Sequence, residues 1–185
     1  MAPFDCDPEV SGSTGTVLPR RAVMVAGAPG SGKTEFSGMI ARATGYPRLE
    51  KDLLAGASPD RDRSYRTLMD LAADITANGS SVILDAGFLP ELAAPGWLLR
   101  QRTGFALLGA RLDVILVESP QAMRLQRMSE RGWDRDMMRL TREQPGTQPA
   151  PAARVQCTVT NAEGIYELLE QAGIVVAGLG LTRDS

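Results

Sequence analysis

Apolar residues in this chain gather in short continuous runs separated by longer amphipathic stretches. The runs that predict strands lie at residues 22–26, 81–85, 112–117, 155–159 and 174–177, with a shorter, weaker one at 47–50. Because they are continuously apolar and do not alternate with polar residues, we expect strands that are buried on both faces, as in a parallel sheet.

Helical patterns lie between the apolar runs, near residues 32–44, 62–78, 119–130 and 161–172, while residues 90–108 show no clear pattern. Strands that alternate with helices predict a three-layer α/β fold with right-handed crossovers. We therefore expect a single domain over about residues 21–180, built on a five-stranded parallel sheet.

Two segments depart from the alternation of predicted strands and helices. Residues 1–20 are rich in Pro, Gly, Ser and Asp, which predicts a disordered tail, and they lack the apolar core of a signal peptide. Residues 132–154 are rich in Pro and Gly. A long irregular segment inside a compact domain often covers a site, so we expect a lid at about residues 128–150.

The stretch "AGAPGSGKT", residues 26–34, follows the first apolar run and precedes a helical pattern. It matches G-x-x-x-x-G-K-T, the P-loop of nucleotide-binding proteins, in the context that this motif requires. Its glycines let backbone N–H groups converge on phosphate oxygens, and the helix start adds a positive dipole end. The expected nucleotide contacts are Gly27, Ala28, Pro29, Gly30, Ser31, Gly32, Lys33 and Thr34.

Within this loop, Lys33 is expected to reach the terminal phosphates of ATP, and the Thr34 hydroxyl to bind Mg²⁺. The guanine-reading Asn-Lys-x-Asp of GTPases is absent, because neither Lys33 nor Lys51 follows an Asn. The chain has no His, which excludes His-dependent catalytic triads. A motor or an AAA-type ATPase usually has a longer chain, whereas a small phosphotransferase needs only the loop, a base and cations.

Two aspartates follow predicted strands, at the edge where parallel sheets bind ligands. Asp52 comes after the run at 47–50 and is expected to act as the base that takes the proton of an acceptor hydroxyl, with a helix cap as the alternative. Asp85 ends the run at 81–85 and is expected to hold Mg²⁺ or to bind the acceptor. Gly87 beside it would allow a ligand to approach the backbone closely.

Arginines recur every three or four residues after the run at 112–117, at Arg124, Arg127, Arg131, Arg135, Arg139 and Arg142. A continuous helix would place them on one face, but Gly132 predicts a break into two short helices. Guanidinium groups bind phosphate oxygens bidentately, so we expect Arg127 and Arg131, then Arg135, to contact ATP. A solvated basic face is the alternative.

Over about residues 22–145 the chain resembles P-loop kinases of the nucleoside/nucleotide-kinase-like group. Within that group it is most similar to small predicted ATP-dependent kinases related to polynucleotide kinase domains. The resemblance is carried by "GAPGSGKT", "EKDLL", "SVILDAGFLPE" and the Arg-x-x-x-Arg of "RMSERG". It implies that Asp52 activates the acceptor hydroxyl and that Arg127 and Arg131 contact ATP.

Polynucleotide kinase domains usually carry arginines directly after the "PE" element, where this chain has Leu92 and Ala93. That departure favours a small-molecule acceptor over a 5′-hydroxyl end of a polynucleotide. The stretch "RLQRMSERGW…TREQ…VTNAEGIYELLEQ" also resembles dephospho-coenzyme A kinases, which remain an alternative. A nucleotide-dependent switch ATPase is an alternative from another class.

Net charge, apolar run length and cysteine positions restrict the classes of partner and the compartment that we expect. The net charge of −2 argues against bulk binding of nucleic acid, and no apolar run reaches the ~20 residues that span a membrane. Cys6 and Cys157 fit no metal or redox spacing, so we expect a cytoplasmic protein. Phe88, Trp97 and Phe105 either line an acceptor pocket or belong to the core. The sequence does not indicate an oligomeric state.

Overall fold

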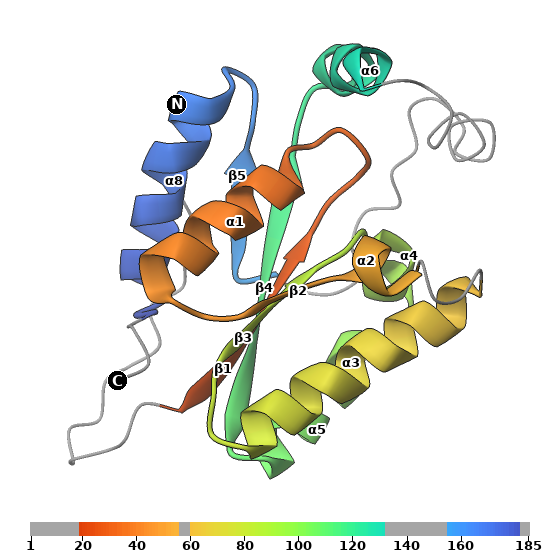
Figure 1. Ribbon diagram of the computed structural model, residues 1–185, viewed down its shortest axis with the longest axis vertical. Helices are drawn as coiled ribbons and strands as arrows, with labels where there is room; N and C mark the ends of the chain where they lie inside the picture. The colour runs from red at the N-terminus through yellow and green to blue at the C-terminus, as the bar shows by residue number, and fades with distance from the viewer. Residues whose placement is uncertain (1–18, 56–59, 132–154, 182–185) are drawn as a thin grey trace.

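The computed structural model describes residues 19–55, 60–131 and 155–181, so most of the predicted tail and lid lies outside the described residues. The elements are β1 (Arg20–Ala26), α1 (Lys33–Thr44), β2 (Arg48–Glu50), α2 (Lys51–Ala55), α3 (Arg61–Ala77), β3 (Val82–Asp85), α4 (Leu89–Ala93), α5 (Trp97–Leu107), β4 (Ala110–Glu118), α6 (Gln121–Glu130), β5 (Cys157–Thr160) and α8 (Ile165–Gly178). Figure 1 shows a twisted sheet between helical layers.

The sheet has the strand order β2-β3-β1-β4-β5, and every pairing is parallel. This confirms the predicted five-stranded parallel sheet. Because β1 lies in the middle, the segment that follows it emerges at the centre of the carboxyl edge. The short β2 pairs with β3 so that Glu50 lies opposite Asp85, which brings the end of β2 to the same edge.

The strand predicted at 174–177 is wrong, because these residues form the last part of α8. The short run at 48–50, which forms β2, completes the five strands of the sheet. The buried positions of α8 are Leu168, Gln171, Ala172 and Val175, a spacing of three to four residues that is typical of a helix. Ile174 has a β-branched side chain, which favours strands, but here it lies on the outer face of the helix and is 41% exposed. Packing of this helical face against α1 therefore overrides the local preference of "IVVA".

The buried strands divide their side chains between two cores, because successive residues point to opposite faces. Residues Ala22, Met24 and Ala26 of β1 join the core on the α3 and α5 side, whereas Val23 and Val25 join the core on the α1 and α8 side. Figure 1 shows these helix pairs on opposite faces of the sheet. Among the described residues, no helix is long and apolar enough to cross a membrane.

A buried ion cluster joins the central strands to the C-terminal helix. The Asp113 carboxylate, which is 0% exposed, accepts hydrogen bonds from Arg21 Nη1 at 2.6 Å and from Arg111 Nε at 2.8 Å. Arg21 Nη2 also donates to the Leu179 carbonyl, at the C-cap of α8. The cluster therefore fixes the end of α8 against the sheet near the start of β1. This is the amino edge of the sheet, opposite the carboxyl edge that carries the loop after β1.

Replacing Asp113 by Ala should leave two arginines without their shared counter-ion, one of them buried. Removing one partner of a buried pair costs about 3–5 kcal/mol, so we expect the free energy of unfolding to fall by about 3 kcal/mol. Urea unfolding measures this, with Asp70→Ala, at an exposed carboxylate on α3, as the matched control. Equal losses in the two variants would contradict the structural role of the cluster.

Candidate functional site

The P-loop, residues 27–34, connects β1 to α1 at the carboxyl edge of the sheet. The Gly27 N–H donates to the Gly87 carbonyl at 3.1 Å, so the loop is tied to the segment that follows β3. β1 lies between β3 and β4, with Val25 opposite Asp85 and Ala26 opposite Leu116. The structure therefore brings the P-loop and Asp85 to one edge, as the sequence predicts.

Two glycines of the loop are required by both conformation and space. Gly30 has φ of 76°, and a Cβ there would lie 2.7 Å from the Arg124 carbonyl oxygen. Gly32, the N-cap of α1, has φ of 94°, and a Cβ there would overlap the Asn161 side-chain amide. The loop can follow this path only because both residues lack a side chain.

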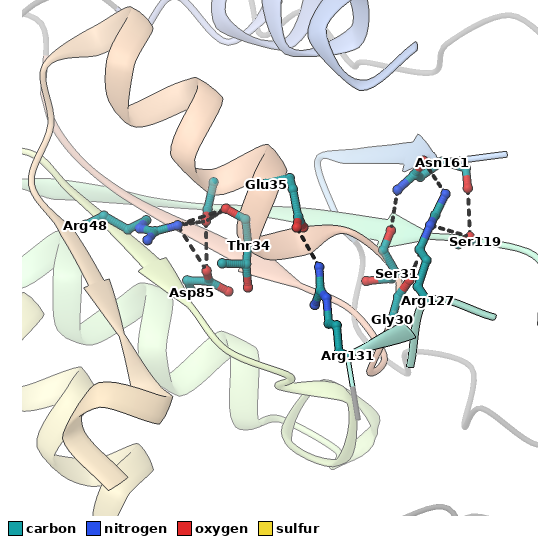
Figure 2. Close-up of polar contacts among 11 residues, drawn as sticks. Gly30, Ser31, Thr34, Glu35, Arg48, Asp85, Ser119, Arg127, Arg131 and Asn161 are labelled. Carbon is teal, nitrogen blue, oxygen red and sulfur yellow. Dashed lines mark hydrogen bonds and ion pairs between the residues drawn. The ribbon is translucent and has the colours of Figure 1, made fainter. Parts of the chain in front are cut away.

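Asp85 lies beside the start of α1 in a network of polar contacts (Figure 2). Its side chain is 2% exposed and accepts a hydrogen bond from Ser37 Oγ at 2.8 Å, while Arg48 Nη1 lies 3.6 Å from its Oδ2. Arg48 also donates to the Thr34 carbonyl at 2.8 Å. Burial raises the pKa of Asp85, and the Ser37 hydrogen bond and the charges of Lys33 and Arg48 oppose that rise.

The Thr34 side chain also opposes the rise in the pKa of Asp85, so the two residues that we expect to bind Mg²⁺ lie near each other. A hydroxyl and a carboxylate are hard oxygen ligands that fit Mg²⁺, and a cation would offset the cost of burying the Asp85 charge. In the described part of the chain no three His, Cys, Asp or Glu residues gather as a metal cluster. A magnesium ion bound here together with ATP would take its other ligands from phosphate oxygens and water.

Arg127 of α6 and Arg131, at the C-cap of that helix, lie on the other side of the loop, as Figure 2 shows. Arg127 Nη1 donates to the Gly30 carbonyl at 3.3 Å and to Ser119 Oγ at 3.1 Å, and its Nη2 donates to Asn161 Oδ1 at 3.0 Å. Arg131 Nη2 pairs with Glu35 Oε1 at 2.6 Å. Two of the three arginines expected to contact ATP thus lie beside the loop, and Arg135 lies outside the described residues.

A cavity of about 230 Å³ opens next to these arginines. The start of α1, helix α6 and the segment after β5 enclose it, with Gly32, Glu35, Arg127, Arg131, Asn161 and Ile165 in its wall. It adjoins the P-loop on the side away from Asp85. Among the described residues, the buried Ser31 hydroxyl of the loop has no hydrogen-bond partner.

Asp52 lies in the first turn of α2, directly after β2. Its side chain is 46% exposed, and its Oδ1 lies 3.1 Å from the ammonium group of Lys51, which is itself buried. The ammonium group also lies 5.4 Å from the centre of the Tyr65 ring. Lys51 therefore holds the Asp52 carboxylate in place at the carboxyl edge while leaving part of it open to a ligand.

The segment after β3 is fixed by Tyr65 of α3. The Phe88 N–H donates to the Tyr65 hydroxyl at 3.2 Å, the two rings meet edge-on at 5.2 Å, and Phe88 has a left-handed φ of 53°. Burial raises the pKa of Tyr65, so its hydroxyl stays neutral at physiological pH. Phe88 and Phe105 are 0% and 4% exposed, which confirms their role in the core; Trp97 is partly buried against the same core.

Sequence reasoning missed three polar side chains around the P-loop: Ser37, Arg48 and Asn161. Asn161 could have been found, because it follows the last residue of a strand in the same way as Asp85 follows an apolar run. Ser37 and Arg48 carry no such signal, since their partners are far away in the sequence or are backbone carbonyls.

Three solved structures show how widely this fold is shared. A sugar kinase from Janibacter sp. HTCC2649 is 22% identical with a TM-score of 0.62, covering 88% of this chain and 96% of that chain. The Mycobacterium tuberculosis APS kinase, in complex with AMPPNP and APS, is 18% identical with a TM-score of 0.62, covering 88% and 98%. A gluconokinase from Sinorhizobium meliloti 1021 is 21% identical with a TM-score of 0.58, covering 88% and 97%.

No curated protein matches the chain. The family described as "AAA domain" matches residues 23–152, which include the P-loop, Asp52, Asp85 and the arginines of α6. That description names no acceptor. The chain has the fold of P-loop kinases and belongs to the AAA domain family.

Proposed function

We propose that the protein is an ATP- and Mg²⁺-dependent kinase that transfers the γ-phosphoryl group to a hydroxyl of a small molecule. The observation that carries this proposal is the meeting of three features at one edge of the sheet. These are the P-loop, the Thr34–Asp85 pair and the partly exposed Asp52. A kinase needs all three, because phosphoryl transfer depends on positioning, charge neutralisation and a proton acceptor.

The donor half of the site binds the triphosphate of ATP. Backbone N–H groups of the loop and the positive end of α1 face the phosphates, and Lys33 neutralises their terminal charge. Thr34 and Asp85 would hold Mg²⁺, which supplies positive charge to the β- and γ-phosphate oxygens. The nucleoside would occupy the cavity between α1, α6 and the segment after β5, beside the loop.

The acceptor half is built around Asp52. The acceptor oxygen forms a bond to the γ-phosphorus as the bond to the β–γ bridging oxygen breaks, and ADP leaves. Asp52 takes the proton that the acceptor hydroxyl loses. Its contact with Lys51 orients the carboxylate, and the Gly87 backbone, hydrogen-bonded to Gly27, lies along the same edge of the sheet.

The comparisons support a small acceptor. The sugar kinase, the APS kinase and the gluconokinase are small-molecule kinases by name, and each is matched over nearly its whole length. The match to an RNA repair complex that contains Pnkp1 covers 65% of this chain and 40% of that chain. Together with the net charge of −2, this favours a metabolite over a polynucleotide acceptor.

A screen for ADP release tests the proposal directly. The full chain is incubated with Mg-ATP and with sugars, other hydroxyl-bearing metabolites, nucleosides, dephospho-coenzyme A and short oligonucleotides in turn. We expect one class of small acceptor to raise ADP release above the background, with a phosphorylated product found by mass spectrometry. Lys33→Met is the control that should lose the signal. A flat profile at the background rate would contradict the kinase assignment and favour the switch ATPase.

Replacing Asp52 by Asn should separate binding from transfer. The amide keeps the size of the side chain but cannot take the proton, so phosphoryl transfer should fall by ~10²-fold or more. Nucleotide affinity, measured by calorimetry with ADP, should be nearly unchanged because the loop is not altered. Asp70→Asn on α3 is the matched control. Turnover near that of the wild type in Asp52→Asn would exclude Asp52 as the base.

Asp85 should make the stability of the nucleotide-free protein depend on pH. Because burial raises its pKa in the folded state, its unfavourable contribution is absent at low pH and grows as pH rises through that pKa. Asp85→Asn does not titrate, so its stability relative to the wild type should increase as the pH rises above about 4. Urea unfolding at several pH values measures the difference. If the difference in free energy of unfolding between the two proteins stayed constant or shrank with rising pH, the charge of Asp85 would not destabilise the folded state.

A further inference from the structure

Three successive carbonyl groups of the P-loop are held by side chains from outside it. Arg124 Nε donates to the Pro29 carbonyl at 3.1 Å, Arg127 Nη1 to the Gly30 carbonyl at 3.3 Å, and Asn161 Nδ2 to the Ser31 carbonyl at 2.9 Å. Figure 2 shows the last two reaching the loop from the same side. The outer side of the loop is therefore lined by side-chain donors from α6 and from Asn161, the residue after β5.

Asn161 is the most firmly placed of these donors. Its N–H donates to the Glu118 carbonyl at 2.8 Å, which continues the ladder between β4 and β5, and its carbonyl accepts from Ser119 Oγ at 2.7 Å. The side-chain Oδ1 accepts from Arg127 Nη2 at 3.0 Å, and the residue is 2% exposed. Every polar group of Asn161 thus has a partner, and the sheet itself fixes where its amide points.

The contact with the Ser31 carbonyl determines where the next N–H points. In a trans peptide the carbonyl of one residue and the N–H of the next point in opposite directions, and the described chain has no cis peptide. When Asn161 holds the Ser31 carbonyl outward, the Gly32 N–H must point to the inner side of the loop. Arg124 holds the Pro29 carbonyl and so orients the Gly30 N–H in the same way. The Ser31 N–H instead donates to the Ala28 carbonyl within the loop, at 3.2 Å.

This support matters because the loop is rich in glycine and gathers N–H dipoles of the same orientation. Glycine gives the backbone many alternative conformations, so an unsupported loop would lose entropy each time it bound an anion. The fit between Asn161 and the loop is close, since a Cβ at Gly32 would overlap the amide. Gly32 and Asn161 therefore form one packing unit.

We infer that Asn161 is a positioning residue for phosphate binding, which aims the Gly32 N–H at the bound phosphate chain by holding the Ser31 carbonyl outward. The inference rests on the part of the proposed function that places a phosphate chain on the loop. It goes beyond that proposal because it assigns a role to a residue about 130 positions away in the sequence. Arg127 then has a second role, holding the amide oxygen of Asn161.

Two substitutions at Asn161 separate this role from its alternatives. Asn161→Asp keeps the size and can still accept from Arg127, but it has no N–H for the Ser31 carbonyl. Asn161→Ala removes both contacts. We expect both variants to bind ADP and inorganic tripolyphosphate about tenfold more weakly than the wild type, measured by calorimetry. Asn78→Asp, the same change at the C-cap of α3, is the control and should bind as the wild type does.

A spectroscopic readout distinguishes positioning from a general structural role. In ¹⁵N-labelled protein, ADP should shift the Gly32 amide resonance strongly in the wild type and weakly in both variants. Resonances of α3, α5 and the strands should stay unchanged. Wild-type affinity in Asn161→Asp would overturn the inference, because Asn161 would then act only through Arg127. Changes spread over the whole spectrum would overturn it as well, in favour of a structural role.

The same experiment separates this inference from the proposed function. A wild-type protein that binds neither ADP nor tripolyphosphate would overturn both the inference and the ATP site. A wild-type protein that binds ADP, loses affinity in both variants and yet phosphorylates no acceptor would contradict only the kinase assignment.

Discussion

The parallel pairing of β1 with both β3 and β4 is the constraint on which the rest of the structure depends. It aligns Val25 with Asp85 and Ala26 with Leu116, so the chain leaves β1 between two neighbouring strand ends. The P-loop must then pass between Asp85 on one side and the elements that follow β4 and β5 on the other. A shift of one residue would turn the apolar side chains of β1 to the wrong cores and separate these groups.

Much of this arrangement could be predicted from the sequence, because it follows from local patterns. Continuous apolar runs located β1, β3, β4 and β5, and the weaker run at 47–50 located β2. The rule that ligands bind at carboxyl edges placed Asp52 and Asp85 at the same edge. The run at 174–177 failed because β-branched residues are compatible with either element, and only the spacing of the buried positions on α8 decides for a helix. Local preference cannot resolve a case that packing decides.

Contacts between distant segments could not be predicted in the same way. Arg48 reaches Ser37 and Asp85, and Asn161 reaches Ser31, only because the fold brings these residues together. Arginine spacing in α6 predicted guanidinium groups near ATP, and the structure places Arg127 against the Gly30 carbonyl. The site thus has an inner surface of backbone donors and an outer support of side chains. Asp85, whose pKa is raised by burial, lies on the side of the loop opposite these supporting side chains.

The most direct test of this account is a crystal structure of the full chain with Mg²⁺ and a non-hydrolysable ATP analogue. The account predicts the triphosphate on the inner side of the P-loop, with the Gly32 N–H directed at a phosphate oxygen and Mg²⁺ next to Thr34 and Asp85. The γ-phosphate should face Asp52 across a space large enough for an acceptor hydroxyl. A nucleotide bound elsewhere, or a γ-phosphate directed away from Asp52, would contradict it.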